Sequence, residues 1–389
     1  MLKLTRIIDE PDFSPTGFNL DDKELLGEFG KVSIDELFVK RFGFNLLKAK
    51  YLLDNYLVHH SNEEDRPDNN PWKLQRLVLD DSKKWSLRNL VPVGEKEPDK
   101  TIHLKLLHLL SMFEVSFTAR QRKNYLFYCL LYLFDLPSYG EKIRYLKWYY
   151  WFVKDLAEKY FRNVYLAPDK LNEINTPLPG SFDEVMLRDN KLDVSNKADV
   201  KPEVFDEIYG NGTEKSKGIP LYVFNYTDYK LWEKYAIELR GEEVKKGSSE
   251  REAFFDRLGC GDFDLNVFKR FYFSRTRRSL EHYYPQANVN NKEGTPDENQ
   301  INCFGNYAMI GSEANSSGSN WDPKTKLDHY LDSSRKIPPV STASIKFMIM
   351  MQKCKDNQDG RSSGLEWVFE DIQEHQEKML TVFQRASTN

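Results

Sequence analysis

The sequence predicts a mainly α-helical fold that contains one short ββα unit, and three observations lead to this prediction. Apolar residues recur at helical spacing in several segments of the chain. The aromatic-rich segment Phe271–Leu280 has the character of a strand, and a second short apolar run follows at Phe304–Ile310. Asn315 then heads a cluster of Ser, Gly and Asn residues, where a turn or helix can begin.

The helical segments follow one another along most of the chain. The first has a capping signal in Ser33 and Glu36 and a predicted break at Gly43. The helices are expected at Leu37–Leu57, Thr101–Val115, Tyr125–Phe134, Ile143–Leu166, Thr227–Leu239, Phe254–Leu258, Ser341–Lys355 and Leu365–Phe383. Between the first two, Trp72–Leu87 is interpreted as a short helix with a connection.

Changes in composition divide the chain into five parts. Residues 167–218 are rich in Asp, Asn, Lys, Pro and Gly and poor in apolar residues, which predicts a loop or linker. The expected parts are a helical domain at 1–166, this linker at 167–218, a helical connection at 219–267, the ββα unit at 268–331 and C-terminal helices packing on it at 332–389.

Composition limits the class of protein. The 389 residues are enough for two or three domains, and a formal net charge of −4 argues against a uniformly basic, histone-like surface. The four cysteines have no CxxC spacing, so neither a zinc site nor a disulfide framework is predicted, which fits a reducing cytoplasm. The longest apolar run, Tyr125–Phe134, is too short to cross a membrane, and no signal peptide is recognised.

The residues with chemical potential gather around the two predicted strands. Glu281 and His282 are adjacent, so they can share a site only at a strand end or bend, which Pro285 indicates. Asn306 lies in the second strand, and Asn315 follows it. A histidine on the first strand and an asparagine on the last element are typical of a ββα-metal nuclease site. There a neutral histidine takes a proton from water, and carboxylate and amide oxygens hold Mg²⁺ or Mn²⁺.

The motifs around these residues resemble those of a known family. The runs SRTRRSLEHYYPQ, FGNYAMIG and NSSGSN, followed by a Lys-x-Lys, resemble the HNH (His-Me finger) domain of the GmrSD-type restriction endonucleases. The resemblance implies that His282 is the general base, that Glu281 and Asn315 are metal ligands for Mg²⁺ (or Mn²⁺), and that Asn306 holds the histidine-bearing loop. Asn320 is an alternative ligand, but the family pattern favours Asn315.

The rest of the chain resembles the same family more weakly. The run KYLLDNYLVHH and the later run SMFEVSFTARQRKNYLFYCLLYLF resemble the helical region before the HNH domain in single-chain members. Those members begin with a nucleotide-hydrolysing domain that carries an Asp-Gly-Gln-Gln-Arg motif, and the sequence contains neither this motif nor a GxxxxGK[ST] loop. Either a separate polypeptide supplies that half or the chain is a fragment; we predict a partner chain.

Basic residues flank the predicted site and favour DNA as the substrate. Double-stranded DNA is expected because a polyanion needs cations on both sides of the reacting phosphate. The predicted nucleic-acid-binding residues are Arg275, Arg277, Arg278, Lys324 and Lys326. On a strand, Arg275 and Arg277 would share one face. The simpler alternative is a solvated strand with scattered charges.

Three hypotheses for the function follow from these patterns. The first is a metal-dependent DNA endonuclease in anti-phage defence, licensed by a partner. The second is a non-catalytic DNA-binding or scaffold subunit of such a complex. The third is the same chemistry on RNA. His329 is a minor candidate for a supporting role beside the site.

Overall fold

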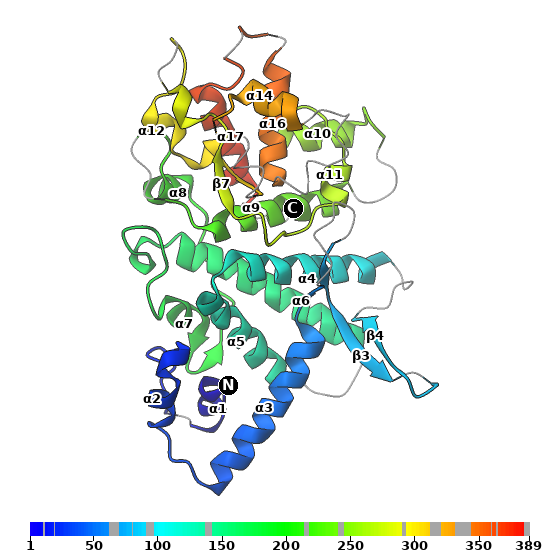
Figure 1. The fold of residues 1–389 in the computed structure, drawn as a ribbon, viewed down its shortest axis with the longest axis vertical. Helices are drawn as coiled ribbons and strands as arrows, with labels where there is room; N and C mark the ends of the chain where they lie inside the picture. The colour runs from blue at the N-terminus through cyan, green and yellow to red at the C-terminus, as the bar shows by residue number, and fades with distance from the viewer. Residues whose placement is uncertain are drawn as a thin grey trace. The chain divides into compact units, whose positions relative to one another are not determined.

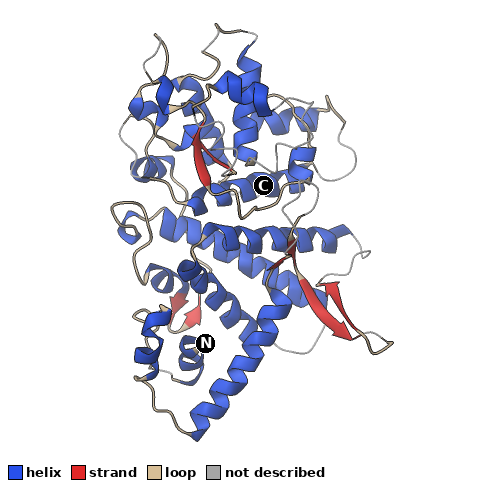
Figure 2. Ribbon diagram, in the orientation of Figure 1, coloured by secondary structure: helices blue, strands red, loops and turns tan. Residues whose placement is uncertain are grey.

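The computed structural model describes residues 1–10, 12–18, 20–61, 70–79, 81–90, 97–136, 142–213, 218–239, 245–289, 293–311, 320–330, 344–358, 360–362 and 365–384. These residues form a mainly helical structure with four small two-stranded sheets (Figures 1 and 2). The chain divides into two compact units. Unit 1 contains residues 1–62, 72–172 and 176–198, and unit 2 contains residues 63–71, 173–175 and 199–389.

Unit 1 is built mainly from long helices. Its helices are α1 (Leu2–Asp9), α2 (Leu25–Phe29), α3 (Glu36–Tyr56), α4 (Glu97–Ser116), α5 (Ala119–Asp135), α6 (Lys142–Tyr160) and α7 (Ser181–Met186). A π-helical turn, Phe161–Tyr165, extends α6. Most of these helices lie where the sequence predicts helices. Helix α3 differs in two ways: it is capped by Asp35, which accepts a hydrogen bond from the Phe38 amide at 2.7 Å, and it continues through Gly43 without a break.

The prediction of a short helix at Trp72–Leu87 is wrong. The structure has strands β1 (His59–His60) and β2 (Trp72–Lys73), followed by a hairpin of β3 (Gln75–Leu79) and β4 (Trp85–Asn89) (Figure 2). Five residue pairs join β3 to β4 in antiparallel register. The two short runs are too brief for a stable helix, and their β-branched and aromatic residues suit paired strands.

The segment predicted as a loop, 167–218, contains ordered elements. These are a 3-10 turn (Pro168–Lys170), α7, the strand pair β5 (Leu187–Arg188) and β6 (Lys191–Leu192), and α8 (Pro202–Tyr209). In unit 1, Asp183 of α7 is buried and forms an ion pair of 2.6 Å with Lys3. The Tyr128 hydroxyl donates to the same carboxylate at 2.7 Å. A few buried side chains therefore order a segment whose overall composition is polar.

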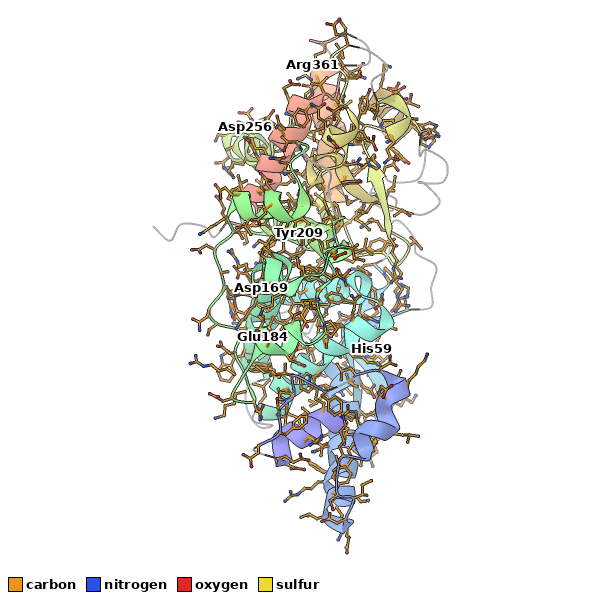
Figure 3. The ribbon with its side chains drawn as sticks, turned by 90° about the vertical axis from the view of Figure 1, so that its left-hand side faces the viewer. His59, Asp169, Glu184, Tyr209, Asp256 and Arg361 are labelled. Atoms are coloured by element: carbon orange, nitrogen blue, oxygen red, sulfur yellow. The ribbon has the colours of Figure 1, made fainter. Side chains whose placement is uncertain are left out.

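Surface ion pairs also connect two elements of this segment. The carboxylate oxygens of Asp169 and Glu184, both labelled in Figure 3, lie 3.1 Å and 2.6 Å from the Lys170 Nζ. These three side chains join the 3-10 turn to α7. Exposed pairs of this kind contribute little stability, about 1 kcal/mol or less each. Removing one partner of the buried Lys3–Asp183 pair would cost more, because it leaves a buried charge without its partner.

Unit 2 contains a long buried helix, α9. Its elements are α8, α9 (Leu221–Glu238), α10 (Ser249–Leu258), α11 (Asn266–Lys269), β7 (Ser279–His282), α12 (Glu298–Ile301), β8 (Tyr307–Ile310), α14 (Pro323–Tyr330), α16 (Ile345–Gln358) and α17 (Phe369–Thr381). Both α9 and α16 are buried over most of their length, and each contacts the other. Asp228 of α9 accepts the Lys346 backbone amide at 3.0 Å and so caps α16.

A tight 3-10 turn, η5 (Phe304–Asn306), packs against α17. A Cβ atom on Gly305 would overlap the Ile372 carbonyl oxygen and lie 2.9 Å from its carbonyl carbon. Only glycine fits this contact, because the obstacle is backbone and cannot rotate away.

We predict that Gly305→Ala lowers the free energy of unfolding of unit 2 by about 3 kcal/mol or more, since overpacking forces backbone shifts. Gly360→Ala in the same unit is the matched control, because no atom lies within 4 Å of its added Cβ. Urea unfolding of both variants measures the difference. Equal stabilities would contradict the close approach of α17 to this turn.

Candidate active site

Strands β7 and β8 place the predicted Glu-His pair at a strand end. They pair antiparallel, with Glu281 opposite Ala308 and His282 opposite Tyr307. The first strand is shorter than predicted: it begins at Ser279, and Phe271–Arg278 is irregular although most of it is buried. The second begins at Tyr307, because Phe304–Asn306 forms the 3-10 turn before it. Between the two strands lie a 3-10 turn at Gln286–Asn288, helix α12 and the turn η5, and α14 lies further along the chain than β8.

Glu281 forms a buried ion pair with Lys326 of α14. Its Oε1 lies 2.6 Å from the lysine Nζ, and the two residues are 4% and 1% exposed. The same ammonium donates to the backbone carbonyls of His282 and of Tyr283, the latter at 3.0 Å. Lys326 therefore ties α14 to the end of β7 and satisfies three acceptors at once.

Burial acts on both members of this pair. It raises the pKa of Glu281, and the nearby Lys326 ammonium opposes that shift. It lowers the pKa of Lys326, which Glu281 opposes in turn. Each charge is therefore stable in this environment only while the other is present.

His282 lies next to Glu281 in a half-buried position. Its Nε2 hydrogen-bonds with the Asn302 Oδ1 at 2.8 Å, and its ring packs on that of Tyr307 with 4.4 Å between centroids. Burial lowers the pKa of His282, and the Asn302 hydrogen bond opposes the shift, while the Lys326 charge adds to it. The imidazole is therefore neutral at neutral pH, as a general base must be.

Asn306 fixes the loop that follows His282. Its Oδ1 accepts from the Tyr284 amide at 2.8 Å and the Trp367 indole at 3.2 Å, and its Nδ2 donates to the carbonyls of Tyr284 and Ile301, each at 3.0 Å. Its side chain is fully buried. These bonds tie Asn306 to the backbone of the loop that follows His282, and its part in catalysis stays a prediction.

Two further side chains support the turn around Asn306. The Lys346 Nζ donates to the carbonyls of Phe304 at 2.8 Å and Tyr307 at 2.7 Å. The Gln376 Oε1 accepts from the Gly305 amide at 2.9 Å. Burial lowers the pKa of Lys346 to about 7. These bonds to the backbone of the turn give the two residues a structural role.

The five predicted DNA-binding residues separate into two groups. Arg275, Arg278 and Lys324 are exposed, and Lys324 forms an ion pair of 3.0 Å with Asp328. Arg277 is 3% exposed and donates to the Tyr272 carbonyl at 3.0 Å. Lys326 is buried against Glu281. The assignment of Arg277 and Lys326 to a DNA-contacting surface is therefore corrected.

The error at Arg277 has a local cause. Residues 274–278 form a turn, in which the Arg278 amide bonds to the Thr276 carbonyl at 3.1 Å, so alternation along a strand does not apply. Arg275 and Arg277 consequently do not share a face.

The remaining candidates are Asn315, Asn320 and His329. Asn315 lies outside the described residues. Asn320 is exposed ahead of α14, and His329 packs on Trp321 with 4.3 Å between ring centroids. Sequence reasoning missed Asn302. A partial signal was available, because Asp297 and Gln300 form a capping box, which predicts that a helix begins a few residues before Asn302.

The chemistry of the predicted metal ligands fits a hard divalent cation. Glu281 and Asn315 both offer oxygen donors, which Mg²⁺ and Mn²⁺ prefer. Within the described residues, no cluster of three or more His, Cys, Asp or Glu side chains is placed to hold a metal. Since Lys326 already bonds to Glu281, a cation at this carboxylate must compete with the lysine ammonium.

Comparison with known proteins gives a match that covers the region containing the candidate site. Residues 224–382 match the family model described as GmrSD restriction endonucleases, C-terminal domain. No curated protein and no solved structure matches the chain. In the described residues, none of the helices combines the length and apolar composition that a membrane span needs. The matched region runs from α9 to the end of α17 and contains Glu281, His282, Asn306 and Lys326, which supports a restriction-endonuclease-related role for unit 2.

Proposed function

We propose that this protein is a metal-dependent HNH-type endonuclease that hydrolyses DNA phosphodiester bonds in restriction or anti-phage defence. One observation carries the proposal. A histidine with a lowered pKa lies beside a carboxylate at the end of β7, within a region that matches the C-terminal domain of restriction endonucleases.

In this proposal, His282 takes the proton from the attacking water. Its neutral ring is available at neutral pH because burial disfavours the charged form. Asn306 does not exchange a proton. It holds the backbone of residues 283–284 so that His282 stays at the strand end.

We propose that Glu281 and Asn315 hold Mg²⁺ or Mn²⁺. When bound, the cation supplies positive charge beside the reacting phosphate. Lys326 neutralises Glu281 in its absence, so ion binding at Glu281 requires the ammonium to move away or to share the carboxylate.

DNA contacts are assigned to the exposed cations Arg275, Arg278 and Lys324. They flank the site in sequence on both sides, and phosphate contacts need exposed charge more than a positive total charge. A separate chain that carries the nucleotide-hydrolysing half remains part of the proposal.

One observation favours a non-catalytic alternative. The Glu281 carboxylate is already paired, as in a site that has exchanged its metal for a structural lysine. In that case the protein binds DNA as a scaffold subunit. The metal response of a Lys326 variant separates the two functions.

We predict that His282→Ala lowers the rate of plasmid cleavage in Mg²⁺, with the partner chain present, by about 100-fold or more, the usual contribution of a general base. His59→Ala, at an exposed histidine of β1, is the matched control and retains the wild-type rate. An unchanged rate in His282→Ala removes this residue from its role. Faster cleavage of RNA than of DNA of equal length assigns the chemistry to RNA.

The pH dependence of wild-type cleavage follows from the direction of the His282 pKa. Because burial lowers this pKa, the base stays unprotonated to more acidic pH than an ordinary histidine. The rate should therefore begin to fall only below the usual histidine range. A fall centred above that range would contradict His282 as the titrating base.

We predict that Lys326→Met lowers the free energy of unfolding in metal-free buffer by about 3 kcal/mol or more, since Glu281 is left buried without its partner. Millimolar Mn²⁺ should then raise the free energy of unfolding by about 2–3 kcal/mol, if its concentration is 100 times its dissociation constant. Urea unfolding with and without Mn²⁺ measures both effects.

The control for this variant is Glu281→Gln combined with Lys326→Met, which removes both charges. This double variant should show no Mn²⁺-dependent gain. A Mn²⁺ gain of equal size in both proteins, or in neither, excludes Glu281 as a metal ligand.

We predict that Arg275→Ala combined with Arg278→Ala weakens DNA binding independently of sequence. The slope of log K against log salt concentration should become shallower by about 0.9 for each phosphate that the variant no longer neutralises. Fluorescence anisotropy over a range of salt concentrations measures the slope. An unchanged slope would place the DNA elsewhere on the protein.

A further inference from the structure

The orientation of the His282 ring depends on a residue that neither the sequence nor the family match assigns. Asn302 follows the four-residue helix α12 and lies across from the end of β7. Its Oδ1 is bonded by the His282 Nε2 at 2.8 Å and by the Tyr307 hydroxyl at 2.9 Å. The side chain is half-buried, so water does not replace these bonds freely.

The backbone fixes which end of the Asn302 amide faces His282. The Nδ2 group donates to the Glu298 carbonyl at 2.7 Å, and a carbonyl oxygen can only accept. The amide oxygen must therefore point toward His282 and Tyr307. A reversed amide would place two oxygens together at Glu298 and break that bond.

This orientation determines the tautomer of the neutral imidazole. An amide oxygen has no proton to give, so the His282 Nε2 must be the donor. The Tyr307 hydroxyl is protonated and donates to the same oxygen, because burial raises the pKa of Tyr307 to about 12. Within the described part of the chain, Asn302 is the residue to which the His282 side chain hydrogen-bonds.

We propose that Asn302 is a positioning residue that holds His282 in the Nε2–H tautomer, so that Nδ1 is the atom that accepts the proton from water. This inference rests on the proposed nuclease function for its consequence, but the tautomer itself does not depend on catalysis. Tyr307 assists by packing on the imidazole and by donating to the same oxygen.

The tautomer can be measured directly in the full-length protein. Long-range ¹⁵N–¹H spectra of protein labelled at histidine distinguish a protonated ring nitrogen from a bare one, and the signals absent from His282→Ala identify His282. At a pH where the ring is neutral, the wild type should have a protonated Nε2 and a bare Nδ1. A protonated Nδ1 in the wild type overturns the proposal without any variant.

Three variants then test Asn302 itself. Asn302→Leu removes the acceptor and should mix the two tautomers, whereas Asn302→Asp keeps an acceptor oxygen and should keep the Nε2–H form. Asn299→Leu, at an exposed position of α12, is the matched control and should leave the spectrum unchanged. A wild-type spectrum in Asn302→Leu overturns the role of Asn302.

Cleavage gives a second reading that separates this inference from the proposed function. Asn302→Leu should reduce kcat by about 10-fold to 100-fold, a part of the roughly 10²–10⁴-fold contribution of a general base, with KM unchanged. Asn302→Asp should recover part of this loss. If the tautomer shifts as expected but the wild type cleaves neither DNA nor RNA, the positioning role is supported and the nuclease function is overturned.

Discussion

The tight turn at Phe304–Asn306 is the constraint on which the candidate site depends. Gly305 lets the backbone of α17 approach, and Asn306 links the turn to the loop after His282 and to Trp367. Lys346 holds the carbonyls on both sides of the turn. Helices α16 and α17 thus reach the site by way of the turn. The position of His282 is therefore set by helices far along the chain from the motif that contains it.

The buried Glu281–Lys326 pair gives the site its second constraint. A lone carboxylate at this depth would be unstable, and a lone ammonium equally so. Each side chain of the pair therefore offsets part of the cost of burying the other. A metal ion would have to compete with Lys326, because the Glu281 oxygen that would bind it already pairs with that lysine. In the proposed function, folding and metal binding would be coupled through this single lysine.

Much of the fold was predictable from local patterns, because helical periodicity reports burial directly. The predicted helices correspond to α3, α4, α5 and α6 in unit 1 and to α9, α10, α16 and α17 in unit 2. The β3–β4 hairpin was missed although its residues suit paired strands. The order in residues 167–198 was missed because it depends on tertiary contacts, such as Lys3 with Asp183. At the site, adjacency in sequence made Glu281 and His282 candidates, and their catalytic and metal-binding roles stay predictions. The burial of Arg277 and Lys326 and the role of Asn302 depend on contacts between distant segments, which spacing does not reveal.

The central claim is that the carboxylate beside His282 can exchange its lysine for a divalent cation. Anomalous diffraction from a crystal soaked in Mn²⁺ tests it most directly. The account predicts a manganese peak within bonding distance of a Glu281 oxygen, with the Lys326 ammonium moved from its present position. A Glu281–Lys326 pair that is intact at saturating Mn²⁺, with no peak beside it, would contradict the account.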